Sequence, residues 1–403
     1  MVLTGAEKDA AIEKLLSRGV AEVIVRDELE EKLRGDRQLR VKLGVDPTRP
    51  DIHLGHYVVF RKLREFQRLG HKVVIIIGDW TARIGDPSGR SVQRQMMTEE
   101  EVRYNAQTYL DQLSKVVDVD EAEVVWQSEW FGEFTLEDVI RLTSKYTVAQ
   151  MLTREDFHTR YEGGSPIAIT ELLYPLLQAY DSVAIRSDIE MGGTDQTFNL
   201  LVGRDIQRES GQEPQDIFTT PILVGTDGHQ KMSKSLDNYI AVNDTPDDMF
   251  GKIMSIPDEP MVEYYRLLTD ISLDEIDQML EDASSGNVNP RDLKARLAKI
   301  IVADLHSPEE AERAEAAFDS VYRQHQLPED MPEVQVESGS GILSVLTTAG
   351  VAKSNREARR LIEQGGIRLD GERVTDPEAT VEINGEMVLQ AGRRRFVRLM
   401  SAG

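Results

Sequence analysis

Apolar and polar positions alternate along the first part of the chain with two different periods. Short apolar runs at 41–46 and 72–78 predict buried strands, whereas the residues from Tyr57 onward, between the two runs, follow the period of a helix. The stretch 98–118 predicts an amphipathic helix, and residues 124–126 predict a further strand. Strands that alternate with helices in this way predict a βαβ unit with parallel strands and a right-handed crossover.

The other segments before residue 326 are mostly helical in pattern. Residues 7–35 predict a helical region with a short turn at 23–26, and residues 135–180 and 247–325 are largely helical. Residues 220–224 form an apolar run that predicts another strand. Parallel sheets bind ligands at the carboxyl ends of their strands, so we expect the functional residues to follow these strands.

The composition changes near the C-terminus. Residues 326–340 are polar, contain proline and glycine, and predict a linker. Residues 354–362 then predict a capped helix with a basic face, and a pair of glycines marks the end of this helix. Residues 367–374 predict a hairpin that turns at an Asp-Gly pair. We therefore expect a small separate domain of helix and strand.

Length and composition limit the class of protein. A chain of 403 residues is long enough for two or three domains. It contains no cysteine, which excludes disulfides and thiolate metal sites, and its 7 histidines are not clustered as a structural zinc site requires. The longest aliphatic run, 73–77, is too short to span a membrane, and the first residues lack the apolar core of a signal peptide. We expect a soluble cytoplasmic enzyme.

The charge of the chain is unevenly distributed. The formal net charge is −24, yet residues 341–403 contain ten basic and eight acidic side chains. An acidic surface repels polyanions, so contact with a nucleic acid must rely on local basic patches. The helix at 354–362 offers such a patch, although a solvated charged helix would have the same composition.

A histidine pair and a lysine pair carry the candidate chemistry. His53-Leu54-Gly55-His56 lies where the first predicted strand turns into a helix, and a helix N-terminus attracts phosphate through its free N–H groups and its dipole. Lys231-Met232-Ser233-Lys234-Ser235 follows the run at 220–224, and ammonium groups on a loop can stabilise charge as it moves onto pyrophosphate. Taken singly, the motifs also fit a helix start with surface histidines and a solvated turn.

A polar stripe on an otherwise apolar helix is the third feature. Tyr174, Gln178 and Asp181 are four and three residues apart, which places them on one helix face. Buried polar groups that satisfy one another would also produce such a stripe. The stretch Gly192-Gly193-Thr194-Asp195-Gln196 then opens another helix.

Together, the histidine and lysine motifs resemble those of class I aminoacyl-tRNA synthetases, and the polar stripe resembles the tyrosyl-tRNA synthetases of bacterial type. The resemblance covers about residues 24 to 399, and residues 341–403 are similar to an RNA-binding domain of a small-subunit ribosomal protein and of pseudouridine synthases. It implies a tyrosine–tRNA ligase. Such an enzyme converts L-tyrosine and ATP to tyrosyl-adenylate and pyrophosphate, then transfers tyrosine to the 3′-terminal adenosine of tRNA(Tyr).

The resemblance also implies a fold and an organisation. The fold class is α/β, with a Rossmann-like parallel-sheet catalytic domain at 1–240, an α-helical anticodon-binding domain at 241–325, the linker at 326–340 and a small α+β RNA-binding domain at 341–403. Within the first domain, residues 135–180 would form much of a homodimer interface. Mg²⁺ would accompany ATP, and neither a tightly bound cofactor nor a metal site of the protein is implied.

Site residues follow from the resemblance, position by position. We expect an ATP site of Thr48, His53, Gly55, His56, Gly193, Asp195, Lys231, Met232, Ser233, Lys234 and Ser235, of which Thr48, both histidines and both lysines are catalytic. We expect a tyrosine site of Gly44, Asp86, Tyr174, Gln178, Asp181 and Gln196, with Asp181 on the phenolic hydroxyl. Arg90 and Arg94 would assist with pyrophosphate, and Arg356, Arg359, Arg360 and Arg368, with less weight Arg393-Arg394-Arg395, would contact RNA.

One position departs from the family pattern. Part of the family has a tyrosine near the first strand that touches the substrate hydroxyl, but this chain has Lys42, which we expect to pair with Asp181. A tryptophan-specific sister synthetase and an inactive RNA-binding paralogue are the alternative functions. The polar stripe disfavours the first, and the intact histidine and lysine motifs disfavour the second.

Overall fold

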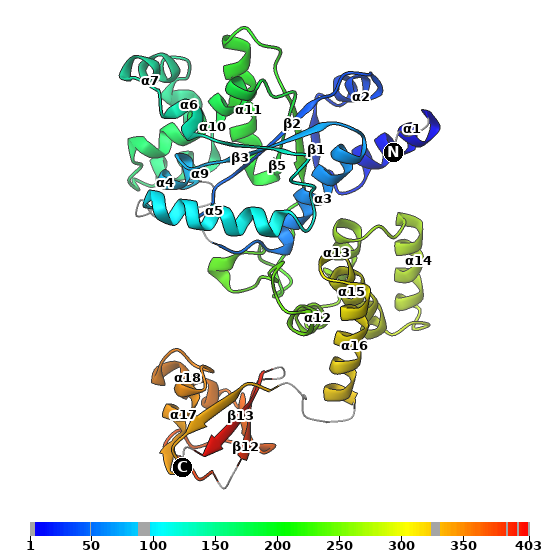
Figure 1. The fold of residues 1–403 in the computed structure, drawn as a ribbon, viewed down its shortest axis with the longest axis vertical. Helices are drawn as coiled ribbons and strands as arrows, with labels where there is room; N and C mark the ends of the chain where they lie inside the picture. Colours follow the sequence, from blue (N-terminus) through cyan, green and yellow to red (C-terminus); the bar gives the residue numbers. More distant parts are fainter. Residues whose placement is uncertain are drawn as a thin grey trace. The chain divides into compact units, whose positions relative to one another are not determined.

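The chain folds into two compact units, Met1–Pro308 and Glu309–Gly403 (Figure 1). The computed structural model describes residues 5–48, 50–87, 97–323, 331–383, 386–392 and 395–401. Arg90, Arg94, Arg393 and Arg394 lie outside the described residues. Within the described ranges, no helix is both long enough and apolar enough to cross a bilayer.

A six-stranded sheet forms the centre of the first unit. In spatial order its strands are β1 (Glu22–Ile24), β6 (Asp216–Thr220), β5 (Ile189–Gly193), β2 (Arg40–Val45), β3 (Lys72–Ile77) and β4 (Glu123–Trp126). Neighbouring strands are parallel, except that β1 pairs antiparallel with β6. The parallel sheet of an α/β fold is thus confirmed.

Two strands differ from the sequence-based prediction. The predicted turn at 23–26 is wrong, because β1 occupies its first two residues and adds an edge strand to the sheet, and a helix, α2 (Arg26–Arg34), begins at its last residue. A three-residue strand carries too little pattern to be recognised without its distant partner. The strand predicted at 220–224 is also misplaced, since β6 ends at Thr220. Pro221 has no N–H for a ladder, and Val224 forms only an isolated bridge with Lys231.

Helices cover both faces of this sheet. α3 (Leu54–Arg68) and α5 (Glu99–Leu113) lie on one face, and α10 (Ile169–Ile185) and α11 (Thr197–Glu209) lie on the other (Figure 1). Residues 73–77 of β3 are fully buried between the two layers. Burial of each such aliphatic side chain stabilises the fold by about 1.5–3 kcal/mol.

The order of the strands reverses between β2 and β5. β2 leads through α3 to β3 on one side, whereas β5 leads through α11 to β6 on the other. The two strands share only the register pairs Val41–Ile189 and Lys42–Glu190. Sheets of this type bind ligands in the crevice that such a reversal leaves at the carboxyl ends of the strands.

Short helices connect β4 to α10, as the helical pattern of 135–180 predicts. They are α6 (Ser128–Phe131), α7 (Leu136–Thr143), α8 (Val148–Met151) and α9 (Glu155–Glu162). Thr135 and Thr147 begin α7 and α8, each with a hydroxyl that accepts a backbone N–H from the first turn. A further short helix, α4 (Thr81–Ile84), follows β3.

The remaining helices of the first unit are α1 (Gly5–Ser17), α2 (Arg26–Arg34), α12 (Pro246–Met254), α13 (Met261–Leu268), α14 (Leu273–Ser284) and α15 (Pro290–Leu305). Of these, α1 and α13 contact α3, and the others pack against one or both of these two or against one another. The buried Arg61 of α3 forms ion pairs with Asp270, after α13, at 2.9 Å and with Asp304 of α15 at 3.4 Å. These contacts hold the helix that begins at the histidine motif against the helical part of the unit.

The second unit contains a separate five-stranded sheet. Its strands in spatial order are β10 (Glu372–Arg373), β9 (Ile367–Leu369), β12 (Glu386–Ala391), β13 (Arg395–Ser401) and β7 (Glu333–Val336). Its other elements are β8 (Ser340–Gly341), β11 (Thr380–Val381), α16 (Pro308–Arg323), α17 (Ile342–Thr348) and α18 (Asn355–Glu363).

Two predicted features of the second unit can be compared with the structure. The hairpin is present, since β9 and β10 pair antiparallel, and Asp370 and Gly371 at the turn both have positive φ angles. β7, however, lies within the predicted linker and pairs in parallel with β13. The alternation of polar and apolar residues in Glu333-Val334-Gln335-Val336 is a strand pattern, which the surrounding polar composition obscures.

Leu346, which is fully buried in the core of the second unit, offers a test of this division. We expect Leu346→Ala to destabilise that unit by about 2–5 kcal/mol, because the substitution leaves a cavity. Amide hydrogen exchange of α17 and α18 should accelerate, while unfolding followed by tryptophan fluorescence stays unchanged, since the chain's 3 tryptophans all lie in the first unit. Ser344→Ala, at an exposed position of α17, is the control. Equal exchange rates in the two variants would contradict the prediction.

Candidate active site

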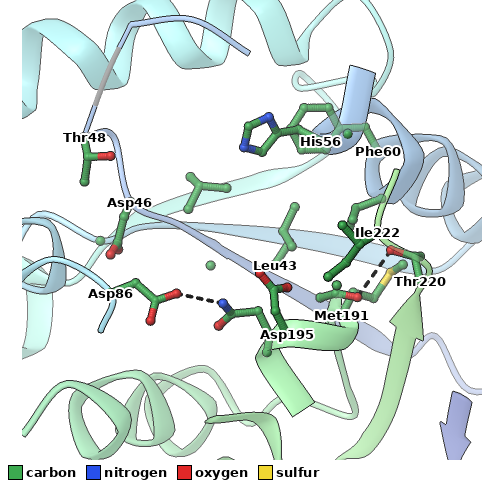
Figure 2. Close-up of a pocket in the computed structure, with 18 of the residues that line it drawn as sticks. Leu43, Asp46, Thr48, His56, Phe60, Asp86, Met191, Asp195, Thr220 and Ile222 are labelled. Atoms are coloured by element: carbon green, nitrogen blue, oxygen red, sulfur yellow. Dashed lines mark hydrogen bonds between the residues drawn. The ribbon is translucent and has the colours of Figure 1, made fainter. Parts of the chain in front are cut away.

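A cavity of about 740 Å³ opens at the reversal of strand order. It is lined by every residue of the first unit predicted for ATP or tyrosine, namely Gly44, Thr48, His53, Gly55, His56, Asp86, Tyr174, Gln178, Asp181, Gly193, Asp195, Gln196, Lys231, Met232, Ser233, Lys234 and Ser235. Figure 2 shows how Thr48, His56, Asp86 and Asp195 surround this space from different segments. Two motifs that are far apart in the sequence therefore share one site.

The two histidines are linked to each other and to the start of α3. His53 is the residue before the helix, and its Nδ1 accepts the backbone N–H of Gly55 at 3.2 Å. His56 Nδ1 accepts the backbone N–H of His53 at 3.3 Å, and the ring centroids are 3.9 Å apart. Because each Nδ1 accepts a hydrogen bond, each neutral ring carries its proton on Nε2.

Both histidines are neutral at physiological pH. Burial, and next the charge of Lys234, lowers the pKa of His56 to about 3. Burial and the neighbouring His56 lower the pKa of His53 still further. The pair can therefore donate N–H hydrogen bonds to a phosphate without contributing positive charge.

Two buried amides on α5 hold the loop that leads to the histidines. Asn105 donates to the carbonyl of Pro47 at 2.9 Å. Gln112 donates to the carbonyl of Pro50 at 2.6 Å and accepts the N–H of Ile52 at 2.8 Å. The sequence analysis missed both amides. Their spacing of seven on a helix face that is otherwise apolar is the signal that could have identified them.

The lysine motif forms a tight loop that ends in the short helix η2 (Lys234–Leu236). Asn238 accepts the backbone N–H of Ser233 at 2.8 Å and donates to the carbonyl of Lys231 at 3.1 Å, so one amide holds the first and the third residue of the motif. Lys231 forms an ion pair with Asp195, which follows β5. The ion pair joins a lysine of the predicted pyrophosphate contact to a second residue of the predicted ATP site.

The polar stripe of α10 reaches into the cavity and finds partners there. Tyr174 donates its hydroxyl to Asp46 at 2.9 Å, and Thr81 donates to the other oxygen of Asp46 at 2.7 Å. Asp181 accepts hydrogen bonds from Gln127 at 2.8 Å and from the ring of Trp130 at 3.2 Å. Burial raises the pKa of Asp181 to about 8. The sequence analysis did not identify these partners.

Asp86 belongs to a closed ring of four side chains. Gln196 donates to Asp86 at 2.7 Å, as one dashed line in Figure 2 shows, and Asn199 donates to Gln196 at 3.0 Å. Arg154 closes the ring, because it donates to Asn199 at 3.2 Å and forms an ion pair with Asp86 at 3.6 Å. Arg154 and Asn199 are buried, so the ring fixes the position of the Asp86 carboxylate.

The predicted pairing of Lys42 with Asp181 is wrong. The Lys42 ammonium pairs instead with Glu190, at 2.8 Å, and both side chains are almost completely buried. The reason lies in the register, which places Lys42 opposite Glu190 on adjacent parallel strands. A sequence alone does not show which strands are neighbours, and so this partner could not be identified from it.

The other predicted contacts lie outside the cavity. Arg356, Arg359, Arg360 and Arg368 are exposed on α18 and β9 of the second unit. Arg359 forms an ion pair with Glu378, and Arg368 donates to the carbonyl of Gly371 at 2.8 Å. Within the described residues, no cluster of three or more His, Asp or Glu side chains is arranged to hold a metal ion.

Comparison with known proteins places the chain in a family. Its sequence matches the family of "tRNA synthetases class I (W and Y)" over residues 34–323 and the "Tyrosine--tRNA ligase SYY-like C-terminal domain" over residues 324–398. The tyrosine–tRNA ligase of Dehalococcoides mccartyi is 54% identical over 96% of this chain and 97% of the relative. That of Thermotoga maritima is 54% identical over 96% of both chains.

Solved structures show the same fold. The tyrosyl-tRNA synthetase of Archaeoglobus fulgidus, complexed with L-tyrosine, has a TM-score of 0.62 at 24% identity and covers 76% of this chain and 99% of its own. A C-terminally truncated mitochondrial tyrosyl-tRNA synthetase of Aspergillus nidulans has a TM-score of 0.64 at 22% identity. The match covers 77% of this chain and 94% of that protein. With these matches over both units, the chain belongs to the tyrosine–tRNA ligases, a family of class I aminoacyl-tRNA synthetases.

Proposed function

We propose that this chain activates L-tyrosine with ATP, releases pyrophosphate, and transfers tyrosine from the adenylate to the 3′-terminal adenosine of tRNA(Tyr). The observation that carries the proposal is the buried carboxylate of Asp181 in the same cavity as the histidine and lysine motifs. Relatives that are 53–54% identical over nearly the whole chain are named tyrosine–tRNA ligase. This agreement favours tyrosine over the tryptophan-specific and inactive alternatives.

The first step needs positioning and charge stabilisation rather than a base. The tyrosine carboxylate is already an anion when it attacks the α-phosphate of ATP, and the P–O bond to pyrophosphate breaks as the new bond forms. In our proposal Thr48 and the neutral His53 bind the γ-phosphate side, and His56 binds near the ribose. Lys231 and Lys234 stabilise the charge that develops on pyrophosphate.

Recognition of tyrosine uses the other part of the cavity. Asp86, Tyr174 and Gln178 bind the α-ammonium group, Gln196 lies near the carboxylate, and Gly44 leaves room for the ring. Asp181 bonds the phenolic hydroxyl. Phenylalanine would leave this buried carboxyl without a partner, and an unpaired buried polar group is costly.

The free chain must rearrange before ATP binds. Lys231 and Asp195 pair with each other in the structure, yet we assign them to pyrophosphate and to the ribose hydroxyls. ATP therefore replaces one intramolecular contact with two contacts of its own. Mg²⁺ would arrive with the nucleotide phosphates, where it usually keeps several of its waters.

A homodimer is part of the proposal, and exposed apolar side chains support it. Leu136 and Ile140 on α7 are 74% and 58% exposed, and Val148 on α8 is 62% exposed. Tyr161 on α9 and Ile169 on α10 are 61% and 78% exposed. Exposed apolar side chains that are concentrated in one segment indicate an interface.

Our proposal also includes RNA contacts by the four arginines of the second unit and a cytoplasmic location.

Exchange of labelled pyrophosphate into ATP tests the activation step. We expect exchange with tyrosine, and none with phenylalanine or tryptophan. Asp181→Ala should lower kcat/KM for tyrosine about 10- to 100-fold, because it removes the hydrogen bond to the substrate hydroxyl and leaves that hydroxyl buried without a partner. Circular dichroism provides the control for folding. Exchange with tryptophan would instead indicate the sister specificity, and absence of exchange with all three would indicate an inactive paralogue.

The pKa of Asp181 predicts a pH dependence of stability. Folding raises this pKa from 3.8 to about 8, so the folded chain binds one proton more than the unfolded chain between these pH values. The free energy of unfolding should therefore fall as pH rises from about 4 to 8, by roughly 1.4 kcal/mol per pH unit from this carboxyl alone. Asp181→Asn should remove that part of the slope in urea unfolding followed by tryptophan fluorescence. Identical slopes would contradict the assignment.

Sedimentation equilibrium tests the proposed dimer. Ile140→Asp places a charge in the exposed apolar segment, and we expect the variant to dissociate at concentrations where the unaltered chain is dimeric. Tyr104→Asp is the matched control, because Tyr104 is 73% exposed on α5, outside the segment. Equal dissociation of both variants, or a monomeric unaltered chain, would rule out this interface.

A further inference from the structure

A buried ion pair lies beside the tyrosine part of the cavity, and the roles assigned above do not use it. Lys42 of β2 and Glu190 of β5 lie side by side on adjacent strands. Their side chains form an ion pair at 2.8 Å and are 0% and 1% exposed. Neither residue was expected to have this partner. Burial of two charges is expensive, and well-packed apolar side chains in their place are often at least as stable. The pair therefore needs an explanation other than stability.

The pair holds Gln178 at two points. The Lys42 ammonium donates to the backbone carbonyl of Gln178 at 2.9 Å. The side-chain amide nitrogen of Gln178 donates to Glu190 at 3.2 Å. One end of the ion pair thus contacts the backbone of this residue, and the other end contacts its side chain.

Two further side chains complete the network. Ser182, one helical turn after Gln178 on α10, accepts from Lys42 at 2.7 Å and donates to Glu190 at 3.1 Å. Gln215, immediately before β6, also donates to Glu190. Ser182 and Gln215 are fully buried, so the position of Glu190 is fixed from three neighbouring segments.

This arrangement determines which atom of Gln178 can face a ligand. An ionised carboxylate can only accept hydrogen bonds, so the amide nitrogen of Gln178 must face Glu190. The amide oxygen is then the end that is available to the cavity, which Gln178 lines. An ammonium group has three donors and no acceptor, and it therefore requires an oxygen at this point.

We propose that Lys42 and Glu190 are positioning residues for the amino-acid substrate, which orient the Gln178 amide so that its oxygen accepts the α-ammonium group of tyrosine. The inference rests on the proposed function and extends it to residues that do not touch the substrate. Without the pair, the amide can rotate and present its nitrogen, a donor, to the ammonium. Binding of tyrosine then loses a charge-assisted hydrogen bond, whereas binding of ATP does not change.

The double variant Lys42→Met, Glu190→Met separates positioning from a structural role. It removes both charges together, so that neither is left buried alone. We expect the KM and Kd for tyrosine to rise about 10- to 100-fold, with the KM for ATP and the thermal midpoint little changed. In a Gln178→Ala background the same double substitution should have no further effect on tyrosine binding.

A second buried ion pair provides the matched control. Arg160 and Glu171 pair at 2.5 Å, with side chains 7% and 11% exposed, and Glu171 lies on α10, as Gln178 does. We expect Arg160→Met, Glu171→Met to leave the KM for tyrosine unchanged. Should the Lys42–Glu190 variant fold poorly, Ser182→Ala removes one connection of the network and should raise the same KM by a smaller factor.

The outcomes distinguish the inference from the proposed function. A double variant that folds normally and binds tyrosine as tightly as the unaltered chain would overturn the positioning role alone. Additive effects of Gln178→Ala and the double substitution would also overturn it, because residues that act through Gln178 cannot add to its loss. An unaltered chain that neither binds tyrosine nor exchanges pyrophosphate would overturn the proposed function, and the positioning role with it.

Discussion

The pairing of β2 with β5 is the constraint on which the rest of the site depends. Only two register pairs join these strands, and the second is Lys42 with Glu190. Beyond it lie Gly44 and Asp46 on one side and Met191 and Gly193 on the other, and all four line the cavity. This one short run of paired residues therefore decides where the sheet is closed and where it opens. The elements that carry the histidine and lysine motifs follow strands on opposite sides of that opening.

Charge in the cavity is balanced before any ligand arrives. Burial lowers the pKa values of both histidines, and the positive charges of Lys231 and Lys234 lower them further, so the rings are neutral. The carboxylates are distributed in the same way, since Asp46 receives two hydroxyl donors and Asp86 receives an amide and a guanidinium. Such fixed donors need little reorganisation when a substrate replaces water. Most of these supporting contacts come from helices rather than from loops.

The sequence predicted those parts of the fold and site that depend on local pattern. The first βαβ unit, the stripe of Tyr174, Gln178 and Asp181, and the capped helix α18 all follow from spacing within one segment. The errors share a different cause. β1 forms because it pairs with β6, which is distant in the sequence. Lys42 pairs with Glu190, which only the order of the strands in the sheet brings near. The spacing of Asn105 and Gln112 is visible in the sequence, but their partners are not, because those partners are backbone groups of another segment.

The ion pair between Lys231 and Asp195 has a consequence for the choice of nucleotide. A ligand that breaks it must offer a new partner to each side chain, and the two partners are the ribose and the phosphates of ATP. Adenosine alone leaves the lysine without its carboxylate, and pyrophosphate alone leaves the carboxylate without its lysine. Both side chains are partly exposed, so the pair contributes at most about 1 kcal/mol. The resulting preference is severalfold, and it favours the intact nucleotide over either of its fragments.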